Sequence, residues 1–246
     1  MNCLNVLLFF IFLLFLLLIY LITKKKSKFI ISPDKIFHTQ NNFLTFNECD
    51  ALINAAKNYL VRSLVNSVDK NNKYTSKQDI SRTSSQTWID KYKYSNIIDK
   101  VIKLVGKYTD YPISIKNFED IQIAKYLPKQ EYQYHYDICH PTQSHITQLK
   151  SCKSEFDIIK SVRYVTVIAY LNDNYTEGET KFTKLNIKIK PEKGKALLFF
   201  NCNLQKDSNV TGLCDIIDNS EHAGLQVKNG EKWIANFWIR LKTYKK

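Results

Sequence analysis

The sequence predicts an α+β fold in which helices come first and a closed or double-sheet β core follows. Three observations support this prediction. Apolar residues recur at helical spacing in two segments before Gly106, whereas from Glu119 onward they follow the two-residue period of strands. The chain has 246 residues, of which 44% are hydrophobic and 13% aromatic, so it can bury one sizeable core. We therefore expect one globular domain behind a short N-terminal anchor.

The N-terminal anchor is expected from an uncharged apolar run at residues 6–22, VLLFFIFLLFLLLIYLI. Its length is close to the roughly 20 residues that cross a bilayer, and four lysines follow it at once. A cleaved signal peptide is the alternative, but no Ala-x-Ala-like site follows the run and no basic residue precedes it. We expect a transmembrane helix in residues 1–23, a basic spacer with an initial strand in 24–42, and the globular domain in 43–246.

The side of the membrane on which the domain lies is open to two interpretations. The lysines that follow the run favour a cytosolic domain by the positive-inside rule. Glycosylation sequons at Asn174 and Asn209 favour a lumenal one. We expect a single-pass membrane protein of the endoplasmic reticulum or a host membrane, with a lumenal catalytic domain. The sequence does not indicate an oligomeric state.

The cysteines form two local pairs, Cys139 with Cys152 and Cys202 with Cys214, that suit loop-closing disulfides in an oxidising compartment. Free or buried thiols are the alternative. The formal net charge of +13 could indicate a nucleic acid or an acidic membrane surface as partner, but the lysines are scattered. We expect a solvated basic surface and no nucleic-acid partner.

Two helices are expected first. Thr45-Phe46-Asn47-Glu48 has the pattern of a capping box, and apolar residues recur at helical spacing from Cys49 to Leu60. The polar stretch from Asn66 to Gln86 is predicted to be a loop. A second helix is indicated by the apolar residues between Ile97 and Val105.

Six strands are predicted in the second half of the chain from their two-residue apolar period. They are Ile121 to Leu127, Tyr132 to Ile138, Val162 to Leu171, Thr180 to Ile189, Lys195 to Asn201 and Lys232 to Leu241. Asn229-Gly230, just before the last of them, is a two-residue hairpin signal. The segment between Ile138 and Val162 is a candidate lid that a Cys139–Cys152 bridge would stiffen.

A candidate metal site is formed by His135-Tyr136-Asp137, because alternation in a strand points the first and third side chains to the same face. His222, before the final strand, is the best-placed third ligand. Two imidazoles and one carboxylate make the facial triad of oxygen-activating iron(II) sites. The same donors also suit zinc, but the chain has no HExxH helix with its general-base glutamate. A strand histidine without a metal role is the remaining alternative.

The surrounding segments resemble the prolyl 4-hydroxylases, a family of iron(II)- and 2-oxoglutarate-dependent dioxygenases. The similar segments occur in the family's order and span roughly Phe43 to Leu241. They are Arg82-Thr83-Ser84-Ser85, Tyr126 with Gln130 and the strand through Asp137, Arg163 to Asn172, Gly178-Glu179-Thr180-Lys181-Phe182, Lys193 to Phe199, and His222-Ala223-Gly224 followed by Val227, Gly230, Lys232 and Trp233.

This resemblance implies a double-stranded β-helix, or jelly roll, backed by the N-terminal helices. It implies hydroxylation of peptidyl proline at C4 with O2 and 2-oxoglutarate, release of succinate and CO2, and L-ascorbate as a supporting reductant. The implied iron ligands are His135, Asp137 and His222. The implied 2-oxoglutarate residues are Lys232, which would pair with the distal carboxylate, Tyr126 and Thr180. The implied peptide-groove residues are Arg82, Ser84, Tyr132, Arg163 and Trp238.

Departures from the family pattern concern the peptide groove more than the iron site. Lys129 and Glu177 stand where glycine is frequent, and Leu225-Gln226 replaces a common Cys-Pro. A lysyl hydroxylase, an oxygen-sensing hydroxylase of one target protein and a nucleic-acid demethylase are alternatives of the same iron class. The lysyl hydroxylase and the demethylase ordinarily use arginine where this chain has Lys232. A catalytically silent, membrane-anchored peptide-binding module is the alternative from another class, although its triad would ordinarily be broken.

Overall fold

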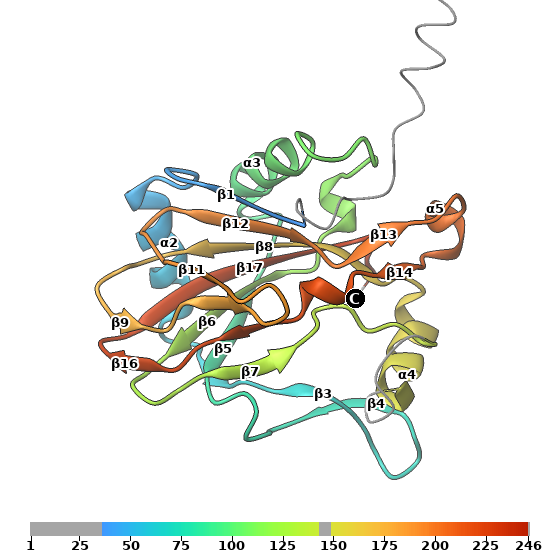
Figure 1. The fold of residues 1–246 in the computed structure, drawn as a ribbon, viewed down its shortest axis with the longest axis horizontal. Coiled ribbons are helices and arrows are strands. Elements are labelled where there is room, and N and C mark those ends of the chain that lie inside the picture. Colours follow the sequence, from blue (N-terminus) through green and yellow to red (C-terminus); the bar gives the residue numbers. More distant parts are fainter. Residues whose placement is uncertain (1–35, 143–148, 246) are drawn as a thin grey trace, which may run out of the picture. The chain divides into compact units, whose positions relative to one another are not determined.

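The computed structural model describes residues 36–142 and 149–245, whose two main sheets are antiparallel and are joined by three two-stranded pairs (Figure 1). The larger sheet contains, in spatial order, β1 (Phe37–Gln40), β12 (Ala196–Phe200), β8 (Arg163–Tyr170), β17 (Lys232–Arg240), β6 (Ile121–Tyr126), β5 (Ser85–Ile89) and β2 (Val61–Arg62). The smaller sheet contains β11 (Ile187–Ile189), β10 (Thr180–Phe182), β15 (His222–Gly224) and β7 (Tyr132–His135).

The larger sheet is buried on both faces, which explains the nearly continuous apolar sequences of its central strands. One apolar cluster includes Tyr126, Ile168 and Ile234 of this sheet with Phe182 of the smaller sheet. A second cluster joins the opposite face to the helices α2 (Phe46–Ala56) and α3 (Ser95–Val105). The result is the jelly-roll-like core, backed by helices, that the resemblance implies.

Both N-terminal helices lie where the apolar spacing predicts them. Thr45 closes the capping box of α2: its hydroxyl accepts a hydrogen bond from the Glu48 backbone at 3.2 Å, and its own N–H donates to the Glu48 carboxylate at 2.8 Å. The apolar face of α3, including Ile98 and Val101, is fully buried. These helices cover the outer face of the large sheet and leave its other face to the smaller sheet.

Three local expectations from the sequence are wrong. The polar stretch from Asn66 to Gln86 is not a loop throughout, because β3 (Val65–Val68) and β4 (Tyr74–Lys77) form a hairpin and β5 begins at Ser85. The strand expected from Thr180 to Ile189 is two strands, β10 and β11, paired across a turn in which Asn186 has φ 53°.

The third concerns the predicted hairpin at Asn229-Gly230. The chain turns there, with Gly230 at φ +81°, but β16 (Val227–Asn229) pairs with β9 (Thr176–Glu177) and not with β17. A side chain at Gly230 would approach the Asn174 carbonyl oxygen to 2.7 Å, so glycine is needed for close packing as well as for the turn.

The remaining elements lie at the edges of the core. They are β13 (Cys202–Leu204) paired with β14 (Cys214–Ile216), α4 (Leu149–Ile159), α5 (Ser208–Thr211), and the short 3-10 helices η2 (Ile115–Asn117) and η3 (Asp218–Ser220). Helix α4 occupies part of the candidate lid segment and contacts the β3–β4 hairpin. Both expected disulfides, Cys139–Cys152 and Cys202–Cys214, are present.

The N-terminal part of the chain adds one strand to the domain. β1 lies within the expected spacer at residues 24–42 and pairs with β12, with Phe37 opposite Phe199. The apolar run at residues 6–22 lies outside the described residues. No helix within the described ranges is long and apolar enough to span a membrane.

Candidate active site

The three proposed iron ligands meet where β7 and β15 pair. His135 and His222 are direct cross-strand partners in the smaller sheet, so their imidazoles project from the same face. Asp137 lies just beyond the end of β7, not within a strand as predicted, and the chain bends there. One donor atom from each residue falls within 4.8 Å of the others, which is the arrangement a single metal ion requires.

Both histidines are oriented by backbone carbonyl groups. The Nδ1 atom of His135 lies 2.7 Å from the Gln133 oxygen, and that of His222 lies 2.9 Å from the Ser220 oxygen. These contacts assign the proton to Nδ1 in each ring and leave the Nε2 lone pair for a metal. Burial and the neighbouring His135 lower the pKa of His222 to about 4, so this ring is neutral at pH 7, the form that binds metals.

The Asp137 carboxylate is held by two donors from the large sheet. Its Oδ2 atom accepts hydrogen bonds from the Thr166 hydroxyl at 2.8 Å and from the Trp238 indole at 2.9 Å. Thr166 and Trp238 are themselves cross-strand partners of β8 and β17. Burial opposes ionisation of Asp137, but His135, His222 and nearby Arg163 outweigh it and hold the pKa well below its ordinary value. Asp137 is therefore a fixed anion.

The donor set fits iron(II). It provides two neutral imidazole nitrogens and one fixed carboxylate from three residues, and so leaves other coordination positions for ligands. The outer contacts to backbone carbonyls, Thr166 and Trp238 are the kind that orient metal ligands.

A second cluster lies at the inner end of the same cavity. Lys232 and Tyr126 are cross-strand partners, and Thr180 is opposite Gly224 on the neighbouring strand. The cavity, about 30 Å³ in volume, is lined by these residues, by all three proposed ligands and by apolar side chains such as Ile168. It is continuous with an outer groove, because several residues line both.

Lys232 is a buried ammonium without a carboxylate partner among the described residues. It is 1% exposed, and its Nζ donates to the Gly178 carbonyl oxygen at 2.7 Å. Burial lowers the pKa of Lys232 to about 8, although nearby Glu179 opposes the change. A buried cation that lacks a counter-charge favours an anionic ligand. Thr180 accepts a hydrogen bond from Tyr170 at 2.8 Å, so its hydroxyl proton is available to such a ligand.

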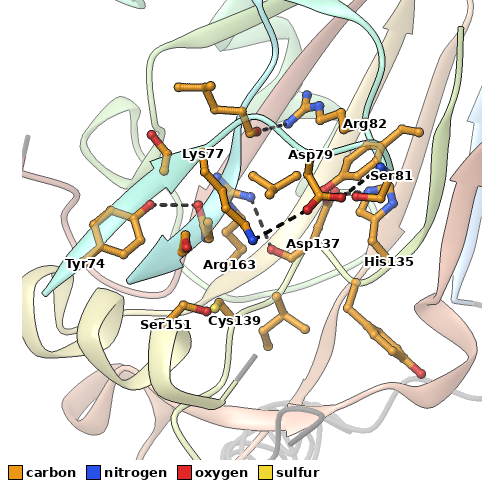
Figure 2. A pocket seen from close by; sticks show the side chains of 18 of the residues that line it. Tyr74, Lys77, Asp79, Ser81, Arg82, His135, Asp137, Cys139, Ser151 and Arg163 are labelled. Carbon is orange, nitrogen blue, oxygen red and sulfur yellow. Dashed lines mark hydrogen bonds and ion pairs between the residues drawn. The ribbon is translucent and has the colours of Figure 1, made fainter. Parts of the chain in front are cut away.

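The outer groove has a volume of about 630 Å³ and lies between the β3–β4 hairpin, helix α4 and the large sheet. Figure 2 shows Arg82, Asp137 and Arg163 in this pocket, with Lys77 reaching toward Asp79. Of the residues expected in a peptide groove, four line it: Arg82, Tyr132, Arg163 and Trp238.

Ser84 is the exception. It is fully buried, its hydroxyl lies 2.8 Å from that of Ser63, and it hydrogen bonds with Tyr126. It does not line the groove, and its contact is with the Tyr126 phenol instead.

Sequence reasoning missed Thr166 and the outer ion network. Thr166 is a buried polar residue between Val165 and Val167 of β8, and this is the signal that could have drawn attention to it. Arg163 donates twice to Glu119 while its guanidinium stacks 3.7 Å from the centre of the Trp238 ring. Glu119 also accepts from Arg240 at 2.7 Å. The Trp238 indole that donates to Asp137 is therefore held in position by the buried Arg163–Glu119 ion pair.

Comparisons with known proteins agree with this site. A family model described as the 2OG-Fe(II) oxygenase superfamily matches residues 121–240. A putative prolyl 4-hydroxylase of Acanthamoeba polyphaga mimivirus is 34% identical over 201 residues, which cover 81% of this chain and 72% of the relative. Prolyl 4-hydroxylase 2 of Arabidopsis thaliana is 32% identical over 248 residues, which cover 92% and 74% of the two chains.

Solved structures give the same assignment. The viral collagen prolyl hydroxylase of Paramecium bursaria Chlorella virus-1, solved as a 2OG complex, is 34% identical with a TM-score of 0.58, and the match covers 84% of this chain and 96% of that chain. A Pseudomonas putida prolyl-4-hydroxylase, 16% identical with a TM-score of 0.52 over 83% of this chain and 92% of its own, shares the fold.

Fold and site together define an iron(II)- and 2-oxoglutarate-dependent oxygenase. Within that class, the chain belongs to the prolyl 4-hydroxylase family.

Proposed function

We propose that this protein hydroxylates peptidyl proline at C4, using O2 and 2-oxoglutarate and releasing succinate and CO2. One observation carries the proposal. A single cavity holds a triad of metal-binding donors at one end and a buried, unpaired ammonium at the other. This combination fits a dicarboxylic acid that chelates a metal through its keto-acid end, and the named relatives are prolyl 4-hydroxylases.

His135, Asp137 and His222 are the proposed iron ligands. When bound, iron(II) and 2-oxoglutarate supply oxygen activation coupled to decarboxylation, and this chemistry needs no protein nucleophile. The chain's own contribution is to present two neutral imidazoles and one fixed carboxylate. Thr166 and Trp238 occupy Oδ2 of Asp137, which leaves its Oδ1 atom for the metal.

Lys232 is the proposed partner of the distal carboxylate of 2-oxoglutarate. The ammonium gains a charge-assisted hydrogen bond in place of its bond to the Gly178 carbonyl. Tyr126 and Thr180 are proposed to donate their hydroxyl protons to the same carboxylate. The apolar side chains of Ile168 and Ile234 exclude water from the aliphatic middle of the ligand.

Tyr132, Arg163 and Trp238 are proposed to orient the peptide in the outer groove. Tyr132 stacks on His135 with ring centres 3.5 Å apart, so it borders the metal site on the groove side. A proline held against this ring presents its own ring to the proposed iron position. The geometry of the groove therefore favours an extended peptide that passes between the hairpin and α4.

The test is succinate release and peptide oxidation by the detergent-solubilised full chain with iron(II), 2-oxoglutarate and ascorbate. A proline-rich peptide should gain one oxygen atom at C4, whereas a matched proline-free peptide and the His135→Ala variant should give neither product. Binding of iron and 2-oxoglutarate without turnover of any proline peptide would favour another target residue, such as lysine, or a silent binding module. We expect ascorbate to prolong turnover by keeping iron in the reduced state.

The proposed location is a membrane of the endoplasmic reticulum or of a host, with the catalytic domain in the lumen and residues 6–22 as the anchor. Two disulfides support an oxidising compartment. The side chains of Asn174 and Asn209 are exposed, as glycosylation requires. Protease protection of the domain in sealed microsomes, with loss of a glycan in Asn209→Gln, would support this topology, and full digestion without detergent would contradict it.

A further inference from the structure

Arg82 differs from Arg163, which also lines the groove, and from Arg240, which shares a carboxylate with Arg163. Arg163 pairs with Glu119, and Arg240 pairs with Glu119 and Glu155, all at 2.6 to 2.8 Å. Arg82 is only 6% exposed, yet no carboxylate of the described residues lies within ion-pair distance of it. The fold thus leaves one buried guanidinium charge uncompensated beside the active site.

The hydrogen bonds of Arg82 are incomplete as well. Its terminal nitrogens donate to neutral acceptors, the Leu64 carbonyl oxygen at 3.3 Å and the Gln122 side chain at 2.8 Å. Its Nε–H is buried and has no acceptor in the described part of the chain. Burying a charge without a partner costs several kcal/mol, so an anionic ligand that reaches Arg82 recovers a large part of that cost.

The co-substrate does not need this charge. The proposed site pairs one carboxylate of 2-oxoglutarate with Lys232 and the other with iron, so both of its charges already have partners. Arg82 lines both the inner cavity and the outer groove, so a peptide in the groove can reach it, and its guanidinium carbon is 4.5 Å from the centre of the Tyr132 ring. That ring in turn stacks on His135, so a single aromatic ring separates Arg82 from the metal site.

The walls of the groove carry the same sign of charge. Lys77 of β4 and Lys150 of α4 both line it, and both are exposed. Among the described residues, two carboxylates line it: Asp79, which lies 3.8 Å from Lys77, and the proposed iron ligand Asp137. A peptide that enters the groove therefore meets a net positive surface with a buried, unpaired cation at its inner end.

We infer that the substrate is an acidic proline segment, in which an Asp or Glu next to the target proline, or one residue further away, pairs with Arg82. This inference rests on the proposed function and specifies its substrate class. The spacing follows from geometry, because an extended chain advances roughly 3.3–3.6 Å per residue and Arg82 is one ring away from the metal site. Lys77 and Lys150 attract the acidic segment to the groove mouth.

The experiment compares three peptides that differ only beside one central proline, where they carry Glu, the isosteric amide Gln, or Lys. The full chain is assayed with iron(II) and 2-oxoglutarate, and C4-hydroxylated product is measured by mass spectrometry. A charge-assisted pair predicts a kcat/KM on the order of tenfold higher for the Glu peptide than for the Gln peptide. The Lys peptide should be the poorest substrate.

Variants of the groove residues test which side chain is responsible for the preference for the Glu peptide over the Gln peptide. Arg82→Gln should reduce the Glu-to-Gln ratio of kcat/KM to about one, whereas Arg82→Lys, which keeps a charge, should retain part of it. Lys150→Gln should lower the ratio about twofold to threefold. Lys153→Gln on the same helix is the matched control, because Lys153 is exposed and does not line the groove, and it should leave the ratio unchanged.

The outcomes separate this inference from the proposed function. Equal turnover of the Glu and Gln peptides would overturn the acidic-segment inference and leave proline hydroxylation standing. A rise in the KM for 2-oxoglutarate in Arg82→Gln, with the peptide ratio unchanged, would assign Arg82 to the co-substrate and would also overturn it. Absence of hydroxyproline with every peptide, while iron and 2-oxoglutarate bind, would instead contradict the proposed function.

Discussion

The indole N–H of Trp238 donates to Oδ2 of Asp137 at 2.9 Å, and this contact joins the peptide groove to the metal site. Sequence resemblance assigns Trp238 to the groove alone. Its position opposite Thr166, the other donor to the same oxygen, makes it a positioning residue for an iron ligand as well. Arg163, stacked on its ring and paired with Glu119, keeps the indole in place.

Trp238→Phe is expected to weaken iron(II) binding roughly tenfold to a hundredfold, because outer hydrogen bonds to ligands typically contribute this much to affinity. Phenylalanine retains the apolar packing and removes only the donor. Anaerobic titration with iron(II), or with cobalt(II) followed by its visible spectrum, measures the change. Trp233→Phe is the matched control, since its indole bonds Glu231 instead. Identical spectra and affinities in both variants would show that the contact does not orient the ligand.

The affinity for 2-oxoglutarate is expected to fall as the pH rises above about 8. The ammonium of Lys232 is the charged form, burial lowers its pKa to about 8, and only the protonated amine can pair with the distal carboxylate. Affinity is therefore complete below that pH and decreases by up to tenfold per unit above it. Calorimetry across this range measures the effect. Lys232→Arg should flatten the pH profile, because a guanidinium stays charged; a steep profile in that variant would exclude Lys232 as the titrating group.

Glu119→Gln is expected to destabilise the fold by about 3–5 kcal/mol, because it leaves the buried Arg163 and Arg240 without their shared carboxylate. Burial opposes ionisation of Glu119, but the two arginines outweigh it and lower its pKa. A lowered pKa contributes stability above the ordinary value near 4.3 that is lost as the pH falls through the folded-state value.

Urea unfolding at pH 7 and below pH 4 tests the Glu119 prediction. The difference between wild type and Glu119→Gln should shrink at the lower pH. Glu177→Gln is the control, since Glu177 forms an exposed pair with Lys228 that contributes at most about 1 kcal/mol. A difference that is the same at both pH values would contradict an ionised Glu119.

Structural features that depend on neighbouring residues in the chain could be predicted from the sequence better than contacts between residues far apart in it. The helices and central strands follow from local apolar periodicity, the candidate ligands His135, Asp137 and His222 follow from motif spacing, and Lys232 is implied by the family resemblance. The sequence predicts loop for the β3–β4 hairpin because none of its strand side chains is buried and they provide no apolar alternation. Local patterns therefore predicted the buried framework of the domain better than the groove wall.

Side-chain contacts between different strands, such as cross-strand pairs and ion pairs, could not be predicted from the sequence. The pairing of Thr166 with Trp238 depends on the register of β8 against β17, which local periodicity does not specify. The same holds for the arginines: Glu119 meets Arg163 and Arg240 from 44 and 121 residues away. That Arg82 lacks such a partner is a property of the folded chain, visible only once the other pairs are assigned.

The two disulfides are expected to act differently, which makes each the control for the other. Cys202–Cys214 links β13 to β14 away from the groove, whereas Cys139 lines the groove two residues after Asp137 and its bridge holds α4. Replacing either pair with alanine should cost roughly 2–4 kcal/mol of stability. Only Cys139→Ala/Cys152→Ala should also raise the KM for peptide, because it frees the helix that forms one groove wall. Equal peptide KM values in the two double variants, at equal stability loss, would show that α4 keeps its position without the bridge.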